Sequence, residues 1–260
     1  MTESPGRPRQ PLPTSVELLP DLPAAYSRAL DSGLAALGLS LGGRTRRAID
    51  DHVRLLLAWT PAINLTSLRD PAEIASRHVV DSLSALPLLG GPPGALLDLG
   101  SGGGYPGLPL AAARPNDSVL LVESIAKKAR FLETVVAAVG LESRVSVAAE
   151  RAETLARQPA QRVRWPVVTA RAVGDLAQLA ELAFPFLVIG GRLIAWKRGD
   201  LREELGPLER LLPSLGGGTV TIRPVNVPAL PGHVLVVVTK RGVTPDVFPR
   251  DPGLRKRRPS

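Results

Sequence analysis

The chain of 260 residues contains no cysteine and few aromatic residues. Without cysteine, disulfide frameworks, thiolate-based zinc or iron–sulfur sites and cysteine nucleophiles are excluded, and a reducing compartment is favoured. Phenylalanine, tryptophan and tyrosine make up 3% of the residues, which argues against a surface that grips single-stranded nucleic acid chiefly by base stacking. The sequence therefore predicts no disulfide-stapled fold and no metal centre.

Long apolar runs are also missing. No run approaches the ~20 residues that a membrane-spanning helix needs, and the opening residues, MTESPGRPRQPLP, lack the apolar centre of a signal peptide. A chain of this length can bury the core of one large α/β domain with an extension. We expect a soluble, cytoplasmic monomer without a membrane partner.

Acidic residues are outnumbered, with 24 Asp and Glu against 32 Lys and Arg, which gives a formal net charge of +8. A basic balance favours a polyanionic partner such as nucleic acid. Arginine far outnumbers lysine, and alanine, glycine, proline and leucine abound, as in proteins from GC-rich genomes. Genome composition is therefore an alternative source of part of the charge.

One glycine-dense stretch, Leu96–Pro109 (LLDLGSGGGYPGLP), organises the rest of the chain. Ala95–Leu99 is a short apolar run typical of a buried strand, and the glycines that follow allow a sharp turn and close approach to a ligand. Pro106 and Pro109 suit the start of a helix, whose free N–H groups would face an anionic group. The pattern predicts a nucleotide-binding strand, loop and helix.

Two cofactor classes fit this loop, as does a glycine turn that binds no ligand. Gly102 to Gly107 match the dinucleotide fingerprint G-x-G-x-x-G, but the match begins two residues late because the strand already ends at Gly100. Asp98, just ahead of the loop, would repel a pyrophosphate and attract the ammonium of an amino-acid moiety. The segment from Asp98 to Gly104 resembles the first motif of class I S-adenosylmethionine (SAM) methyltransferases, which favours SAM over NAD.

The chain before the loop is expected to form a flexible leader over residues 1–22 and a helical extension over residues 23–90. Helices are expected over Pro23–Leu39, ending at Gly38, over Thr45–Trp59 and over Pro71–Leu86, with a linker over Pro87–Gly94. In the third helix, His78 and Asp81 form an i, i+3 pair able to hydrogen-bond. A general-base pair and a structural bond that fastens this helix to the domain behind it both fit the pair.

The second half alternates strands and helices, as a doubly wound parallel sheet requires. We expect an α/β, Rossmann-like fold with a mostly parallel seven-stranded sheet over residues 91–241, followed by a basic tail over residues 242–260. After the first strand, a helix is expected over Ile125–Val139 and strands over Val119–Glu123, Val145–Ala148, Val167–Ala170, Gly191–Trp196, Thr219–Val225 and Val234–Thr239. Glu123 would end the second strand, where an acid can take both ribose hydroxyls of either cofactor.

Several ordered blocks together resemble the RsmG/GidB family, bacterial methyltransferases that modify N7 of a guanine in 16S ribosomal RNA. The resemblance runs from about residue 45 to the basic end. The blocks are Trp59 to Asp70 (WTPAINLTSLRD), Arg77 to Ser82 (RHVVDS), Asp98 to Gly107, Lys128 to Leu132 (KARFL), Thr169 to Ala172 (TARA), and Phe248-Pro249-Arg250 followed by Pro252-Gly253.

This resemblance implies SAM as the cofactor and 16S rRNA or the small ribosomal subunit as the partner. Tyr105 stands where the family has an aliphatic or aromatic residue, and Pro166, expected at the first residue of the fourth strand, stands where the family commonly has Asp. Together with the loop analysis, the expected cofactor-binding residues are Asp98, Gly100, Gly102, Gly104, Tyr105, Glu123, Ala152, Glu153 and Arg171. The expected RNA contacts, chiefly to phosphates, are Arg77, Lys128, Arg130, Lys197, Arg250, Arg255, Lys256, Arg257 and Arg258.

Guanine N7 carries its own in-plane lone pair, so its attack on the SAM methyl needs alignment and exclusion of water but no general base. The [DN]-P-P-[YF] motif of amino-methyltransferases is missing after the fourth strand, where Ala170-Arg171 stands. Arg171 and Lys197 are expected to act by positioning, through charged hydrogen bonds, although Lys197 also fits a solvated strand end. Rival functions are methyl transfer to another substrate, a non-catalytic RNA-binding ribosome-assembly factor, and an NAD-dependent reductase.

Overall fold

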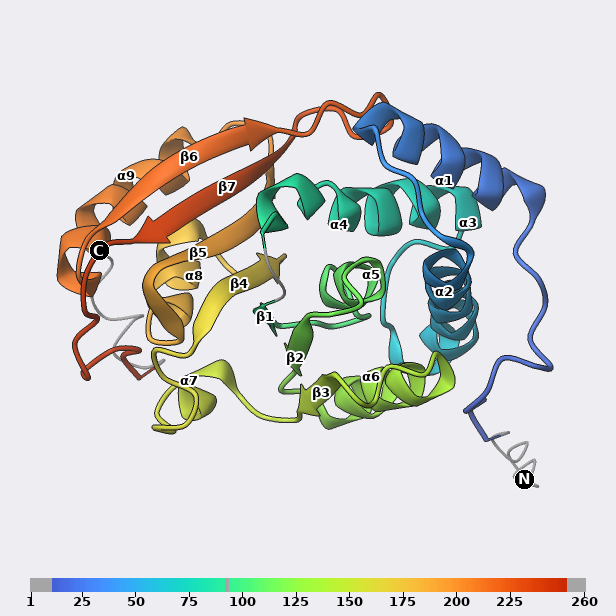
Figure 1. The fold of residues 1–260 in the computed structure, drawn as a ribbon, viewed down its shortest axis with the longest axis horizontal. Coiled ribbons are helices and arrows are strands. Elements are labelled where there is room, and N and C mark those ends of the chain that lie inside the picture. The colour runs from blue at the N-terminus through green and yellow to red at the C-terminus, as the bar shows by residue number, and fades with distance from the viewer. Residues whose placement is uncertain (1–10, 92–93, 252–260) are drawn as a thin grey trace, which may run out of the picture.

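The computed structural model describes residues 11–91 and 94–251, which form a twisted sheet covered by helices on both faces (Figure 1). The strand order is β3-β2-β1-β4-β5-β7-β6. All neighbours pair in parallel except β7, which is antiparallel to both β5 and β6. The strands are β1 (Ala95–Leu99), β2 (Ser118–Val122), β3 (Val145–Ala148), β4 (Trp165–Arg171), β5 (Leu187–Arg198), β6 (Gly218–Pro224) and β7 (His233–Lys240). The expected mostly parallel seven-stranded sheet is confirmed.

Strand β4 begins earlier than the sequence predicts. Trp165 already pairs with Leu187 of β5, and the register shifts before the next pair, Val167 with Arg192. Pro166 therefore lies at the second residue of the strand, inside this irregularity, and its predicted place at the first residue is wrong. A break in the ladder tolerates proline because the missing N–H leaves no regular hydrogen bond unmade.

The first two helices are those expected, with one boundary changed. Helix α1 (Ala24–Leu37) ends at Gly38, whose φ of 65° is the left-handed conformation that glycine favours. Helix α2 (Gly43–Ile63) runs past Pro61 and ends at Asn64, so its predicted end at Trp59 is wrong. Trp59, just before the extra turn, packs against Phe131 of helix α6 (Ala126–Ala138) with ring centroids 5.5 Å apart.

The third expected helix is continuous from Pro71 to Leu83, three residues short of its predicted end, but its middle is π-helical. Asp70 caps α3 (Pro71–Ile74) by accepting the Ala72 N–H, a π-helical stretch η1 follows over Ala75–Val80, and α4 covers Asp81–Leu83. A 3-10 turn, η2 (Leu86–Leu89), covers the last residue of the expected helix and the first three residues of the expected linker. Because a π-helix winds more slowly than an α-helix, the expected i, i+3 alignment within this segment is lost.

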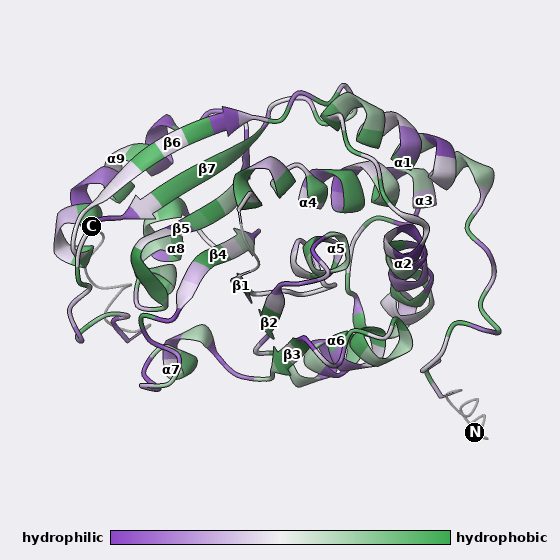
Figure 2. Ribbon diagram, in the orientation of Figure 1, coloured by the Kyte–Doolittle hydropathy of each residue, from purple (hydrophilic) through white to green (hydrophobic). Residues whose placement is uncertain are grey.

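The remaining helices are divided between the two faces of the sheet. They are α5 (Gly107–Ala113), α6 (Ala126–Ala138), α7 (Ala152–Leu155), α8 (Leu176–Ala183) and α9 (Arg202–Leu211), with a 3-10 turn η3 (Leu212–Leu215). Helices α1 to α6 pack on one face, where Leu96 and Leu121 point, and α7 to α9 pack on the other with Leu97 and Leu120. Figure 2 shows apolar residues on the strands between these layers and polar ones along the outer side of α2 and α9. The N-terminal helices thus share one core with α5 and α6.

The expected flexible leader is packed over the part that the structure describes, from residue 11 onward. Arg54 donates hydrogen bonds to the carbonyls of Val16, Leu19 and Pro20, and Trp59 Nε1 donates to Pro13 O at 2.8 Å. The segment before α1 therefore lies against α2 instead of standing free. No helix within residues 11–91 and 94–251 has both the length and the apolar character that crossing a membrane requires.

The expected basic tail is anchored as far as Asp251. Phe248 is buried in the core beside α8, and Arg250 binds the buried Glu181 through its backbone N–H and its guanidinium, with Nη2 2.5 Å from Oε2. Arg250 thus holds the chain end to α8 in place of the expected RNA contact. The other expected contacts of the tail, Arg255, Lys256, Arg257 and Arg258, lie outside the described residues.

Candidate functional site

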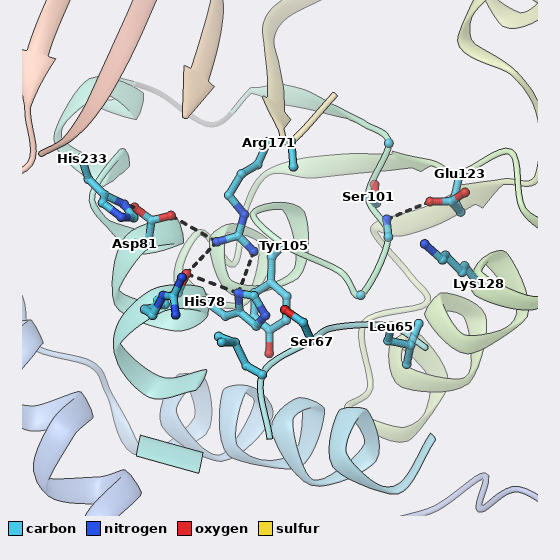
Figure 3. A pocket seen from close by; sticks show the side chains of 16 residues that line it. Leu65, Ser67, His78, Asp81, Ser101, Tyr105, Glu123, Lys128, Arg171 and His233 are labelled. Atoms are coloured by element: carbon cyan, nitrogen blue, oxygen red, sulfur yellow. Dashed lines mark hydrogen bonds and ion pairs between the residues drawn. The ribbon is translucent and has the colours of Figure 1, made fainter. Parts of the chain in front are cut away.

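A cavity of about 400 Å³ opens at the carboxyl ends of β1 and β4 (Figure 3). Strands β2 and β3 extend the sheet on one side of this point and β4 and β5 on the other, so the cavity lies at a topological switch point, where open α/β sheets bind ligands. Its walls are Leu65, Ser67, Leu68, Arg77, His78, Asp81, Gly100, Ser101, Gly102, Gly103, Tyr105, Glu123, Lys128, Arg171, Ala172 and His233.

A second cavity of about 170 Å³ lies beyond Gly100, which lines both. Ala152 and Glu153 line this smaller cavity together with Ser124 and Val173. Of the expected cofactor-binding residues, Gly100, Gly102, Tyr105, Glu123 and Arg171 therefore line the larger cavity and Ala152 and Glu153 the smaller one. Asp98 and Gly104 line neither.

Asp98 is fully buried behind the loop, and the expectation that its carboxylate faces a ligand ammonium is not met. Oδ1 accepts a hydrogen bond from Thr169 Oγ1 at 2.7 Å, and Oδ2 accepts the Gly107 N–H at 3.2 Å. Burial raises the pKa of Asp98 to about 6, although the hydrogen bond from Thr169 opposes the shift. The carboxylate thus links β1 to β4 and to the start of α5, and it holds the two ends of the glycine loop together.

Two glycines of the loop differ in what surrounds them. At Gly104, a Cβ would lie 2.4 Å from Leu108 Cδ1 and 2.9 Å from His52 Nε2, so close packing requires glycine there. At Gly102, the nearest atom to a Cβ is Gly100 O at 3.7 Å, and the residue borders the cavity. The backbone at Gly102 is left-handed, with φ of 54°, and its N–H donates to Glu123 Oε2 at 2.9 Å. Gly102 therefore presents an uncrowded backbone to the cavity.

Tyr105 lies between two histidine rings, those of His52 and His78, with centroid distances of 4.6 and 4.7 Å. His52 Nε2 is 2.7 Å from the Gly103 carbonyl, which can only accept, so the nitrogen carries the proton. Burial lowers the pKa of His52 to about 4. His52 is not among the site residues predicted from the sequence; its one signal there is a polar residue on the apolar face that carries Ile49, Val53 and Leu56.

Arg171 is held by three acceptors. Nη1 donates to Arg77 O at 3.0 Å and to Asp81 Oδ2 at 3.2 Å, and Nη2 lies 3.1 Å from His78 Nδ1. Arginine cannot give up its proton, so His78 Nδ1 is the acceptor and His78 Nε2 donates to Thr66 Oγ1 at 2.7 Å. Burial and the Arg171 charge lower the pKa of His78 to about 3.

The predicted His78–Asp81 hydrogen bond is therefore wrong, because each side chain binds Arg171 instead. Of the two interpretations left open, the fastening role describes the geometry, since both residues connect η1 and α4 to strand β4. Asp81 reaches further, with Oδ1 3.0 Å from His233 Nδ1 and its backbone O accepting the Trp196 Nε1–H. His233 was also missed, because nothing near it in the sequence points to Asp81.

Of the other expected RNA contacts, some lie at the larger cavity and some do not. Lys128 and Arg77 border the cavity, whereas Arg130 is exposed on α6 and does not line it. Lys197 points away, with Nζ 2.9 Å from Gly174 O and 2.5 Å from Glu204 Oε2, and its side chain is 13% exposed. The expected positioning role of Lys197 at the site is therefore not supported, because α9 supplies an acid that neutralises it.

Comparisons with known proteins identify the family of this chain and a solved protein of similar fold. A family model described as rRNA small subunit methyltransferase G (GidB) matches residues 45–225. A protein of Roseiflexus sp. strain RS-1 named ribosomal RNA small subunit methyltransferase G is 40% identical over 224 residues, which cover 86% of this chain and 95% of that protein. A protein of the same name from Chloroflexus aggregans is 40% identical over 232 residues, covering 89% and 97%. A solved putative transferase from Pyrococcus horikoshii has a similar fold, with a TM-score of 0.51 at 17% identity over 70% of this chain and 67% of that one.

Proposed function

Because the chain belongs to the rRNA small subunit methyltransferase G family, we propose that it transfers the methyl group of SAM to N7 of a guanine in 16S rRNA of the small ribosomal subunit. The family is one of SAM-dependent methyltransferases, and the chain is such an enzyme. The observation that carries the proposal for this site is the paired cavity at the switch point, whose lining residues all lie in the matched segment except His233.

The residues around the two cavities fit SAM. Gly102 offers backbone without a crowding side chain, and the carboxylate of Glu123, although it already accepts the N–H groups of Gly102 and Ile125, retains lone pairs for ribose hydroxyls. Glu153 in the smaller cavity would meet the adenine amino group. Asp98 would contribute by holding the loop and not by direct contact. When bound, SAM supplies a methyl group made electrophilic by its sulfonium.

The side chains at the larger cavity suit a reaction that needs alignment and no base. The Nδ1 lone pair of His78 is occupied by Arg171, and His52 is buried against Gly103. Arg171 keeps Nε–H and one Nη2–H without an acceptor in the described part of the chain, so it retains donors for the cofactor or RNA. The other three N–H groups of Arg171 are hydrogen-bonded within the protein. These bonds hold the guanidinium, and so the two remaining N–H groups, in position before a ligand binds.

RNA binding is expected to draw on Arg77 and Lys128 at the cavity mouth and on the basic residues 255–258. Lys128 lies across the cavity from Arg171 (Figure 3). We further propose that the enzyme acts in the cytoplasm, on ribosomal RNA, and that it does so as a monomer. Light scattering at micromolar concentration measures the oligomeric state directly.

The decisive experiment incubates the protein with small ribosomal subunits that lack the modification and with methyl-labelled SAM. We expect N7-methylguanosine in the 16S rRNA by nucleoside mass spectrometry, and Arg171→Ala is expected to lose transfer while remaining folded. Label in another molecule would identify a methyltransferase with a different substrate. SAM binding without transfer to any ribosomal RNA would favour the assembly-factor alternative and overturn the proposal.

A further inference from the structure

We propose that His233 recognises the 2-amino group of the target guanine and is a specificity-determining residue of the enzyme; the inference rests on the proposed function. His233 is the first residue of β7 and lines the larger cavity. Its backbone is fixed on both sides, since its N–H donates to Leu230 O at 3.2 Å and its carbonyl accepts the Val225 N–H at 2.9 Å. The backbone at His233 is therefore held in place before substrate binds.

The hydrogen bond to Asp81 determines which nitrogen of His233 accepts. His233 Nδ1 lies 3.0 Å from Asp81 Oδ1, while Asp81 Oδ2 accepts from the Arg171 guanidinium. Because a carboxylate only accepts, Nδ1 carries the proton, and in the neutral ring Nε2 carries a lone pair. No donor within residues 11–91 and 94–251 pairs with Nε2. The cavity wall thus presents an acceptor.

The shape of guanine brings a donor to this acceptor. N7 lies on one edge of the purine, and N1–H and the 2-amino group lie on the opposite edge. In Figure 3, Glu123 and Ser101, on the cofactor side, lie on one side of Arg171, and Asp81 and His233 lie on the other. A guanine that turns N7 toward the cofactor side therefore turns its amino group toward His233. Adenine presents no such donor there, and its N1 lone pair would face that of Nε2.

Other groups at the cavity are less suited to this contact. Asp81 has a side-chain exposure of 3%, and both of its oxygens are engaged. His78 has its two ring nitrogens paired with Arg171 and Thr66, and it covers one face of Tyr105 while His52 covers the other. His233 supplies an acceptor on the side of the cavity opposite to Glu123 and Ser101 (Figure 3).

Two conservative variants separate recognition from a structural role. In His233→Asn, the amide nitrogen can replace Nδ1 and keep the bond to Asp81, but no acceptor remains at the position of Nε2. In His233→Gln, the amide oxygen reaches the position of Nε2, and the bond to Asp81 is lost. SAM affinity by calorimetry and the thermal midpoint establish that each variant is folded and loaded.

The measurement compares kcat/KM for methyl transfer to an RNA substrate carrying guanosine or inosine at the target, since inosine keeps N7 but lacks the 2-amino group. Wild type is expected to prefer guanosine by about 10- to 100-fold, His233→Asn to lose this preference, and His233→Gln to keep part of it. The inference is overturned if His233→Asn prefers guanosine over inosine as strongly as wild type does. It is also overturned if wild type shows no such preference, and in both cases the proposed function stands. Failure of wild type to methylate guanosine at all would instead overturn the proposed function.

Discussion

The carboxylate of Glu123 accepts the backbone N–H of Gly102 at 2.9 Å, which ties the end of β2 to the middle of the glycine loop. The residue expected to bind ribose thus also shapes the loop that faces the cofactor. Glu123→Gln replaces one acceptor oxygen by a donor, which would face the N–H of Gly102 or Ile125. We expect a 10- to 100-fold weaker SAM affinity, about 1.5–3 kcal/mol, by calorimetry; an affinity equal to that of wild type would contradict the assignment.

The two glycines Gly102 and Gly104 provide a matched pair of alanine variants. Gly104→Ala forces a Cβ to 2.4 Å from Leu108 Cδ1 and is expected to lower the thermal midpoint by several degrees. Gly102→Ala meets no close protein atom and adds only the ~1 kcal/mol strain of a left-handed alanine, yet its methyl group enters the space next to the cavity. We expect Gly102→Ala to fold with a small loss of stability and to lose SAM binding. SAM binding retained by Gly102→Ala would show that the loop does not cradle the ligand.

The raised pKa of Asp98 predicts that the unfolding free energy depends on pH. Its folded-state pKa of about 6 exceeds the unfolded value of 3.8, so between these values the folded state binds the proton more tightly and its contribution to stability falls as pH rises. The loss is complete above about pH 6 and is on the order of 3 kcal/mol. Urea unfolding of wild type and Asp98→Asn, measured from pH 4 to 7, gives the difference between their unfolding free energies. This difference should change up to about pH 6 and stay constant above it. A constant difference would contradict the raised pKa.

Two C-terminal truncations should differ in their effect on stability, because Phe248 and Arg250 are packed against the domain. Removal of residues 252–260 leaves Phe248 and Arg250 in place, so we expect an unchanged thermal midpoint together with weaker RNA binding and a salt slope smaller by roughly 3. Removal of residues 245–260 takes Phe248 out of the core and deprives the buried Glu181 of Arg250. The unfolding free energy should then fall by about 3 kcal/mol or more. Filter binding over a salt series tests the first truncation, and an unchanged slope would show that the basic residues do not contact RNA.

Local patterns were sufficient for the parts of the fold that depend on neighbours in the chain. β1 and β3 begin and end as predicted, because each is a short apolar run between turns, and Gly38 ends α1 because glycine accepts the left-handed conformation. The π-helical stretch over Ala75–Val80 was not predictable from periodicity. Its register is stabilised by Arg171 and Trp196, which come from strands far along the chain.

The site shows the same division between local and distant contacts. The glycine loop, Glu123 and Arg171 were identified correctly as residues around one cavity, because strand ends in a parallel sheet meet at one edge. Asp98 and Lys197 were misplaced, since a strand pattern does not tell which partner a buried side chain finds: Thr169 and Gly107 for Asp98, Glu204 for Lys197. His52 and His233 needed contacts with Gly103 and Asp81 that only the folded chain makes.

The sheet order has a consequence for the newly synthesised chain. Among the described strands β7 leaves the ribosome last, yet it lies between β5 and β6, so β6 has no described sheet partner until β7 arrives. His233 follows Asp81 by 152 residues and travels on that same strand. A nascent chain that has already formed the glycine loop therefore still lacks one wall of its cavity. The described sheet and this wall of the cavity are therefore complete only after the β6–β7 hairpin has been synthesised.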